Sequence, residues 1–167
     1  MPDEEVQLRA RYLGAACVQA AQGWAERLLE RLPAQAGRAD PQMRRIVLRE
    51  LGLLARHWST RQIWHRLETN EHAAKELNLA VLRVFTETFK LPRDGSGLRY
   101  ASLGSLSEEA RELSARLVTA LGLEHPPLVR ELQAGIIAWR EAVLRAVEQS
   151  LTLSREQVAA TANAQRS

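Results

Sequence analysis

The chain has 167 residues with 46% apolar and 26% charged side chains, the composition of one globular domain with a sizeable core. Aromatic residues are only 5% and helix-forming residues dominate, which argues against a sheet protein. The net charge of +3 is carried mostly by arginine and is too small to identify a partner by itself.

A single cysteine, Cys17, excludes an intramolecular disulfide within this sequence and fits a reducing compartment. The first residues are acidic and polar, unlike a signal peptide, and no stretch of about 18 apolar residues is present to cross a membrane. We therefore expect a cytoplasmic protein that does not associate with membranes.

Local signals predict the helices in chain order. The first spans residues 4–31. The second begins after Asp40, because the next residue is a proline and proline is favoured in the first turn, and it continues to about His57. Ser59 opens a Ser-x-x-Gln capping box, which predicts a break there and a short third helix over residues 60–67.

The fourth predicted helix lies at the middle of the chain. Asn70 is a good N-cap, and the helix spans residues 71–90. Apolar Leu79 and Leu82 lie on a second side of this helix, which predicts a central position in the bundle. The following segment, residues 91–104, contains an Asp-Gly-Ser-Gly turn signal and is expected to be a Gly-rich loop.

The C-terminal third predicts three more helices. A Ser-x-x-Glu capping box opens one over residues 105–121, and a Pro-Pro pair opens another over residues 126–150. A further capping box starts a short helix at Ser154. The expected fold is an all-α single-domain bundle of five to six main helices over residues 1–158, with a frayed tail over residues 159–167.

The second helix carries a cluster of arginines. Between Arg38 and Arg66 the chain has seven arginines and only two acidic residues. On a regular helix Arg45, Arg49 and Arg56 fall within about 40° of one another, and the opposite side is apolar. Gly52 lies in the same stripe and is expected to leave it open, which predicts an exposed arginine face.

A guanidinium group pairs with phosphate through two hydrogen bonds and stays charged at every physiological pH, so this face suits a polyanion. The leading hypothesis is a non-catalytic helical binding or adaptor protein that acts in a larger assembly and contacts DNA or RNA. Docking of an acidic protein surface, or a merely solvated face, are the alternatives for the same residues. The predicted nucleic-acid-binding residues are Arg44, Arg45, Arg49, Arg56, Arg61 and Arg66.

Residues 44–100 also have the order of elements found in a winged helix-turn-helix: helix, short helix, longer helix and Gly-rich turn. In this alternative, a DNA-binding transcription regulator, Leu98 and Tyr100 support a strand of the wing. Its basic residues are Lys90, Arg93 and Arg99.

A third alternative rests on seven residues. The segment from Arg66 to His72 resembles the Arg-x4–6-His motif of HEPN-type ribonucleases, which are all-α bundles of similar size. The resemblance implies that His72 acts on the 2′-hydroxyl of RNA and that Arg66 stabilises the phosphate in the transition state. Leu67 departs from the polar residue that this family usually has after the arginine.

The helix predicted over residues 126–150 has two apolar lines, and one is expected to face the core. The other, Ile137, Leu144 and Leu151 at heptad spacing, is the predicted contact with a protein partner or a second copy of the chain. The sequence contains no phosphate-binding loop, dinucleotide fingerprint, paired-Cys metal motif or nucleophile elbow, so we expect no cofactor, no metal and no catalytic residue.

Overall fold

The computed structural model describes residues 1–31, 41–93, 98–121 and 126–164. These residues form seven helices and no strand, which confirms the predicted all-α bundle. The helices are α1 (Asp3–Arg31), α2 (Pro41–Arg66), α3 (Glu71–Thr88), α4 (Leu98–Ala101), α5 (Leu106–Leu121), α6 (Pro126–Thr152) and α7 (Arg155–Ala164). All except α4, a single turn of 4 residues, are main helices of the bundle.

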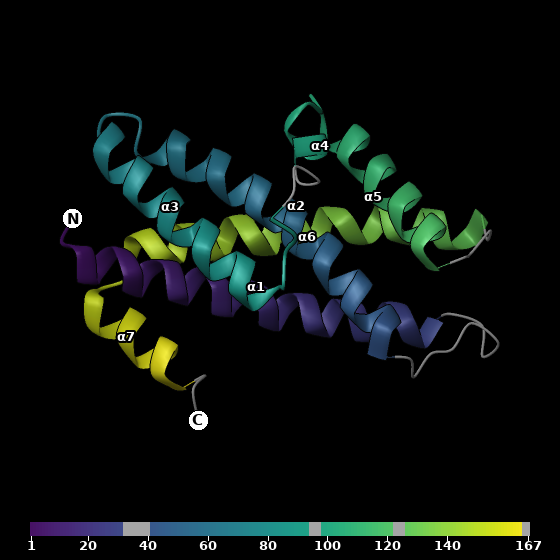
Figure 1. Ribbon diagram of the computed structural model, residues 1–167, viewed down its shortest axis with the longest axis horizontal. Coiled ribbons are helices and arrows are strands. Elements are labelled where there is room, and N and C mark those ends of the chain that lie inside the picture. Colours follow the sequence, from purple (N-terminus) through teal and green to yellow (C-terminus); the bar gives the residue numbers. More distant parts are fainter. Residues whose placement is uncertain (32–40, 94–97, 122–125, 165–167) are drawn as a thin grey trace.

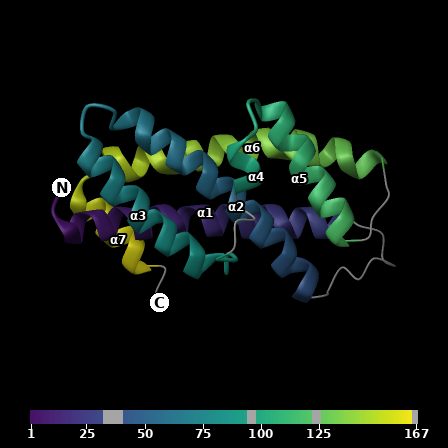
Figure 2. The same cartoon turned by 45° about the horizontal axis from the view of Figure 1, so that its top comes forward.

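The two long helices α1 and α6 run along the long axis of the molecule and pack against each other (Figure 1). Helices α2 and α3 form a hairpin that packs on α1, and α5 packs against α2 and α6. Helix α7 lies against α1 at the end of the molecule where the chain begins (Figure 2). Helix α1 therefore contacts four other helices and organises the bundle.

The core is a single cluster of buried side chains to which α1, α2, α3, α4, α5 and α6 all contribute. Burial of this apolar surface is the main force that holds the helices together. The largest fully buried side chains are Leu13, Leu51, Leu53, Leu54, Ile63, Leu77, Phe85, Tyr100, Leu113, Leu117 and Leu132.

Two glycines allow helices to approach closely. A Cβ atom built on Gly135 of α6 would lie 2.6 Å from the Trp24 ring of α1. A Cβ atom built on Gly14 of α1 would clash with Cγ1 of Val84 of α3. Both contacts are too short for any larger residue, so these glycines set the spacing of α1 from its neighbours.

Three local capping signals predict helix starts that the structure confirms. The side chain of Asn70 caps α3. At the start of α5 the N–H of Ser105 donates to the Glu108 carboxylate over 3.1 Å, and the N–H of Glu108 donates to the Ser105 hydroxyl oxygen over 3.2 Å. Ser154 and Gln157 make the same reciprocal pair before α7. These are the capping boxes that the sequence predicts.

The predicted break at Ser59 is wrong, because α2 is one continuous helix from Pro41 to Arg66. Ser59 is fully buried and lies between the buried side chains of Trp58 and Ile63. A break would expose these residues, so tertiary packing overrides the local capping signal. The predicted central position of α3 is also wrong, because Leu79 and Leu82 are exposed.

Two segments near predicted boundaries are more helical than expected. Within the loop predicted over residues 91–104, Leu98–Ala101 forms α4, and the buried ring of Tyr100 ties it to the core. Helix α7 continues to Ala164, so the predicted start of the tail at residue 159 lies inside this helix.

Candidate functional site

A hollow lined by three basic residues lies where α2 passes the end of α3. Arg45 and Arg49 of α2 line this hollow together with Lys90, which lies two residues after the end of α3. Its volume is about 380 Å³. We call this hollow the basic groove; it is lined by Val18, Gln22, Gln42, Arg45, Ile46, Leu48, Arg49, Thr88, Phe89 and Lys90.

The backbone at the end of α3 positions Lys90. This residue has a φ of 53°, the left-handed conformation that usually belongs to glycine after a helix. The N–H of Leu91 donates to the carbonyl oxygen of Thr86 over 3.1 Å and closes the end of the helix. A left-handed conformation costs a non-glycine residue about 1 kcal/mol. The surrounding fold therefore holds Lys90 in a backbone conformation that is locally unfavourable.

Phe89 divides the arginine stripe of α2. A Cβ atom built on Gly52 would lie 2.5 Å from Cγ of Phe89, so the ring sits directly on the glycine. Gly52 is therefore covered, and the prediction that it leaves the stripe open is wrong. Because Gly52 lies between Arg49 and Arg56 along the stripe, the Phe89 ring separates Arg56 from the basic groove.

The other predicted arginines do not line this groove. Arg44 forms an ion pair with Glu26, and Nε of Arg66 lies 3.1 Å from Oε1 of Glu148. Arg56 is half-buried, and burial lowers the pKa of its guanidinium. The remaining member of the predicted set, Arg61, lines a different cavity. The structure thus brings together Arg45 and Arg49 with Lys90, which the sequence placed on a wing.

The residues that line the basic groove include three cations and no carboxylate. Arg45 is exposed and makes no ion pair with any residue that the structure describes. Nε of Arg49 lies 3.9 Å from Oε1 of Glu50. That carboxylate is already bound by Arg116, whose Nε donates to it over 2.6 Å. The positive charge of the groove is therefore largely uncompensated by the protein.

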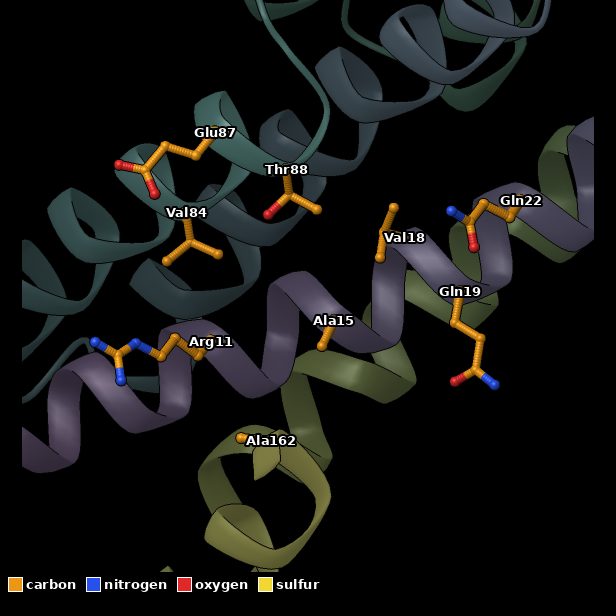
Figure 3. A pocket seen from close by; sticks show the side chains of 9 residues that line it. All are labelled: Arg11, Ala15, Val18, Gln19, Gln22, Val84, Glu87, Thr88 and Ala162. Atoms are coloured by element: carbon orange, nitrogen blue, oxygen red, sulfur yellow. The ribbon is translucent and has the colours of Figure 1, made fainter. Parts of the chain in front are cut away.

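The basic groove continues into a larger hollow along α1, the central groove, with a volume of about 570 Å³. Val18, Gln22 and Thr88 line both hollows. Figure 3 shows that α3 forms one side of the central groove, α1 the other, and that Ala162 of α7 lies beside it. Its lining residues are Arg11, Ala15, Val18, Gln19, Gln22, Val84, Glu87, Thr88 and Ala162.

The winged helix-turn-helix and the Arg-x4–6-His motif each require an arrangement that the described residues do not have. Within the described parts of residues 91–102 there is no hairpin, and Leu98 and Tyr100, expected in a strand, belong to α4. Arg66 pairs with Glu148 of α6, whereas Nε2 of His72 lies 3.2 Å from Oε1 of Glu76 on its own helix. Arg66 and His72 therefore bind different carboxylates instead of facing one reaction centre.

The apolar line predicted on α6 is not uniformly exposed. Ile137 is 51% exposed, whereas Leu144 and Leu151 are partly buried against the core. None of the described helices is both apolar and long enough to span a membrane. The described residues also contain no cluster of three or more His, Cys, Asp or Glu side chains suited to a metal ion.

Comparisons with protein-family models, with curated proteins and with solved structures find no match to this chain. The chemistry of its surface is therefore the basis for a functional proposal.

Proposed function

We propose that this protein is a non-catalytic nucleic-acid-binding protein that holds a single strand in the basic groove. The observation that carries the proposal is the convergence of Arg45 and Arg49 of α2 and Lys90, just after α3, on one groove whose lining contains no acid. Guanidinium and ammonium groups supply the phosphate contacts that dominate affinity for nucleic acids.

The shape of the site favours a single strand over a duplex. The three cations lie in a hollow between helices rather than on a protruding helix or hairpin that enters a duplex groove. The central groove extends the track along α1 from Gln22 to Arg11, about 16 Å at the rise of an α-helix. Its lining adds one cation, Arg11, and one carboxylate, Glu87, so the basic groove supplies most of the positive charge. A polymer with regularly spaced phosphates suits such a track, because single-strand binders combine a basic groove with a continuous path for the backbone.

The neutral side chains of the groove fit this ligand as well. Gln22 and Thr88 line the shared part of the two grooves and offer both donors and acceptors of hydrogen bonds. The apolar floor includes Val18 and Ile46, which lowers the local dielectric constant and strengthens charge pairing. An acidic protein segment also has the right charge, so the test below includes polyglutamate as a second ligand.

The test is the affinity for a labelled oligothymidylate of about 12 nucleotides, within the site sizes typical of single-strand binders. The variant R45Q/R49Q/K90Q removes the three cations. We expect about 100-fold weaker binding, at about 1 kcal/mol for each lost phosphate contact.

The matched control is R83Q/R111Q/R145Q, which makes the same change in net charge. Its three arginines are exposed on α3, α5 and α6 and line neither groove. We expect this variant to bind nearly as the wild type does. Equal loss in both variants, or tighter binding of polyglutamate than of the oligonucleotide, would show that the proposal is wrong.

A further inference from the structure

A second cavity, of about 370 Å³, lies on a different part of the molecule, where α2 meets α6 and the start of α5. Its lining is mostly polar, unlike that of the central groove. We call it the polar cavity; it is lined by Trp58, Arg61, Gln62, His65, Gly104, Ser105, Leu106, Glu109, Arg140 and Leu144.

A buried carboxylate forms part of its wall. Glu109 of α5 is 3% exposed. The indole N–H of Trp58 donates to its Oε2 over 2.8 Å, and Nε2 of His57 donates to its Oε1 over 3.2 Å. These two donors hold the carboxylate in one orientation. Since a carboxylate has about four acceptor sites, Glu109 retains capacity to accept a hydrogen bond from a ligand.

Two arginines give the cavity a positive side. Arg61 of α2 and Arg140 of α6 are both exposed residues that line it. Nη1 of Arg61 lies 3.8 Å from Oε1 of Glu109, too far for a hydrogen bond. Arg140 makes no ion pair within the described part of the chain. Both guanidinium groups therefore have donors to offer an oxyanion.

The neutral groups add both kinds of hydrogen bond. The amide nitrogen of Gln62 donates to Glu148 over 2.9 Å, which leaves its carbonyl oxygen as an acceptor. The hydroxyl oxygen of Ser105 accepts from the N–H of Glu108, which leaves its hydrogen to donate. The cavity thus offers cationic donors together with a buried anionic acceptor, a combination that suits a ligand with an oxyanion and hydroxyl groups.

We propose that the polar cavity binds a small hydroxylated oxyanion, a phosphate ester or a carboxylate, with its charged group on Arg61 and Arg140 and a hydroxyl on Glu109. A volume of about 370 Å³ lies within the range of pockets that bind small molecules. This proposal is independent of nucleic-acid binding, because the polar cavity and the basic groove share no residue.

The experiment is a titration followed by the indole N–H signals in a ¹H–¹⁵N NMR spectrum. The Trp58 N–H reports on the cavity because it is bound to Glu109, and its signal is assigned from its loss in Trp58→Phe. The probes are ribose 5-phosphate, gluconate and uncharged ribose. We expect a saturable shift of the Trp58 signal with one or both anions and none with ribose. The signals of partly buried Trp24 and buried Trp139, which do not line the cavity, should stay in place. A response to ribose 5-phosphate alone assigns a phosphate ester, and a response to gluconate assigns a carboxylate.

Two variants decide whether the cavity is the site. R61Q/R140Q is expected to bind the anion at least about tenfold more weakly than the wild type does. R83Q/R145Q makes the same change in charge elsewhere on the molecule and is expected to bind the anion as the wild type does. The groove variant R45Q/R49Q/K90Q is also expected to keep this binding. The proposal is overturned if neither anion shifts the Trp58 signal, or if the shift survives in R61Q/R140Q.

Discussion

The ring of Phe89 rests on Gly52, where an added Cβ atom would lie 2.5 Å from Cγ of the ring. This contact joins the end of α3 to the middle of α2. Lys90 follows Phe89 directly, so the position of the Phe89 ring determines where Lys90 lies in the groove that it shares with Arg45 and Arg49. The close packing of the core and the charge of the basic groove therefore depend on the same glycine.

Gly52→Ala is expected to lower the free energy of unfolding by about 1–3 kcal/mol, because the methyl group displaces a buried ring in a packed contact. The same displacement moves Lys90 and weakens binding of the oligonucleotide. Gly23→Ala is the control: the nearest atom to its added Cβ is a flexible arginine nitrogen at 3.7 Å. This control should be more stable by about 0.5–1 kcal/mol. Urea unfolding measures both, and equal stability of the two variants would contradict the role of the contact.

Two substitutions of Lys90 separate the effect of its left-handed backbone on stability from the effect of its charge on binding. Lys90→Gly removes the charge and also suits the left-handed backbone, whereas Lys90→Ala removes the charge alone. We expect the glycine variant to be about 1 kcal/mol more stable than the alanine variant. We expect both to lose the same affinity for the oligonucleotide, since each lacks the ammonium group. A glycine variant that binds as the wild type does would remove Lys90 from the site.

The pair of Arg116 and Glu50 holds a buried charge beside the groove. Arg116 donates to Glu50 through Nε over 2.6 Å and through Nη2 over 3.1 Å, and Glu50 is 3% exposed. This hydrogen bonding raises the pKa of the Arg116 guanidinium. Arg116→Met leaves the buried carboxylate without its hydrogen-bonded partner and with only Arg49 at 3.9 Å, and we expect the free energy of unfolding to fall by about 3 kcal/mol.

The double variant Glu50→Leu/Arg116→Met is the matched test of that pair. It removes both charges, so it should recover most of the stability lost by Arg116→Met alone. If the double variant is as unstable as the single one, packing of the arginine chain rather than its charge is what matters.

His57 makes stability depend on pH. Burial lowers the pKa of its imidazole, against the attraction of the Glu109 carboxylate and together with repulsion from Arg61 and Arg56. As the pH falls below the unfolded value of about 6.5 towards the lower folded value, the unfolded chain takes up the proton more readily. The free energy of unfolding should therefore fall over this range. His57→Gln keeps a donor for Glu109 without titrating, so its stability should change less between pH 7 and pH 5; an identical pH profile would contradict this role.

The helix starts were predictable because they depend on residues close in sequence. Asn70, Ser105 and Ser154 cap the helices that their sequence context indicates. The break at Ser59 was predicted wrongly, since the burial of a side chain against other helices cannot be seen in four consecutive residues. Packing between helices keeps α2 continuous through Ser59, and it also leaves Leu79 of α3 exposed.

The candidate site was predictable only in part for the same reason. The spacing of Arg45 and Arg49 places them on one face of α2, and this follows from helix geometry alone. Lys90 lies near them only because α3 packs back along α2, so that Phe89, just after α3, rests on Gly52 of α2. Neither the coverage of Gly52 by Phe89 nor the pairing of Arg44 and Arg66 with acids on other helices leaves a signal in the local sequence.

The salt dependence of oligothymidylate binding tests the central proposal most directly. The logarithm of the binding constant of the wild type should fall linearly with the logarithm of the salt concentration. For R45Q/R49Q/K90Q the slope should be smaller by about 2, since each lost contact to a single strand contributes about 0.7. The slope of R83Q/R111Q/R145Q should equal that of the wild type. Binding that does not depend on salt, or an unchanged slope in R45Q/R49Q/K90Q, would contradict a phosphate-binding role for the basic groove.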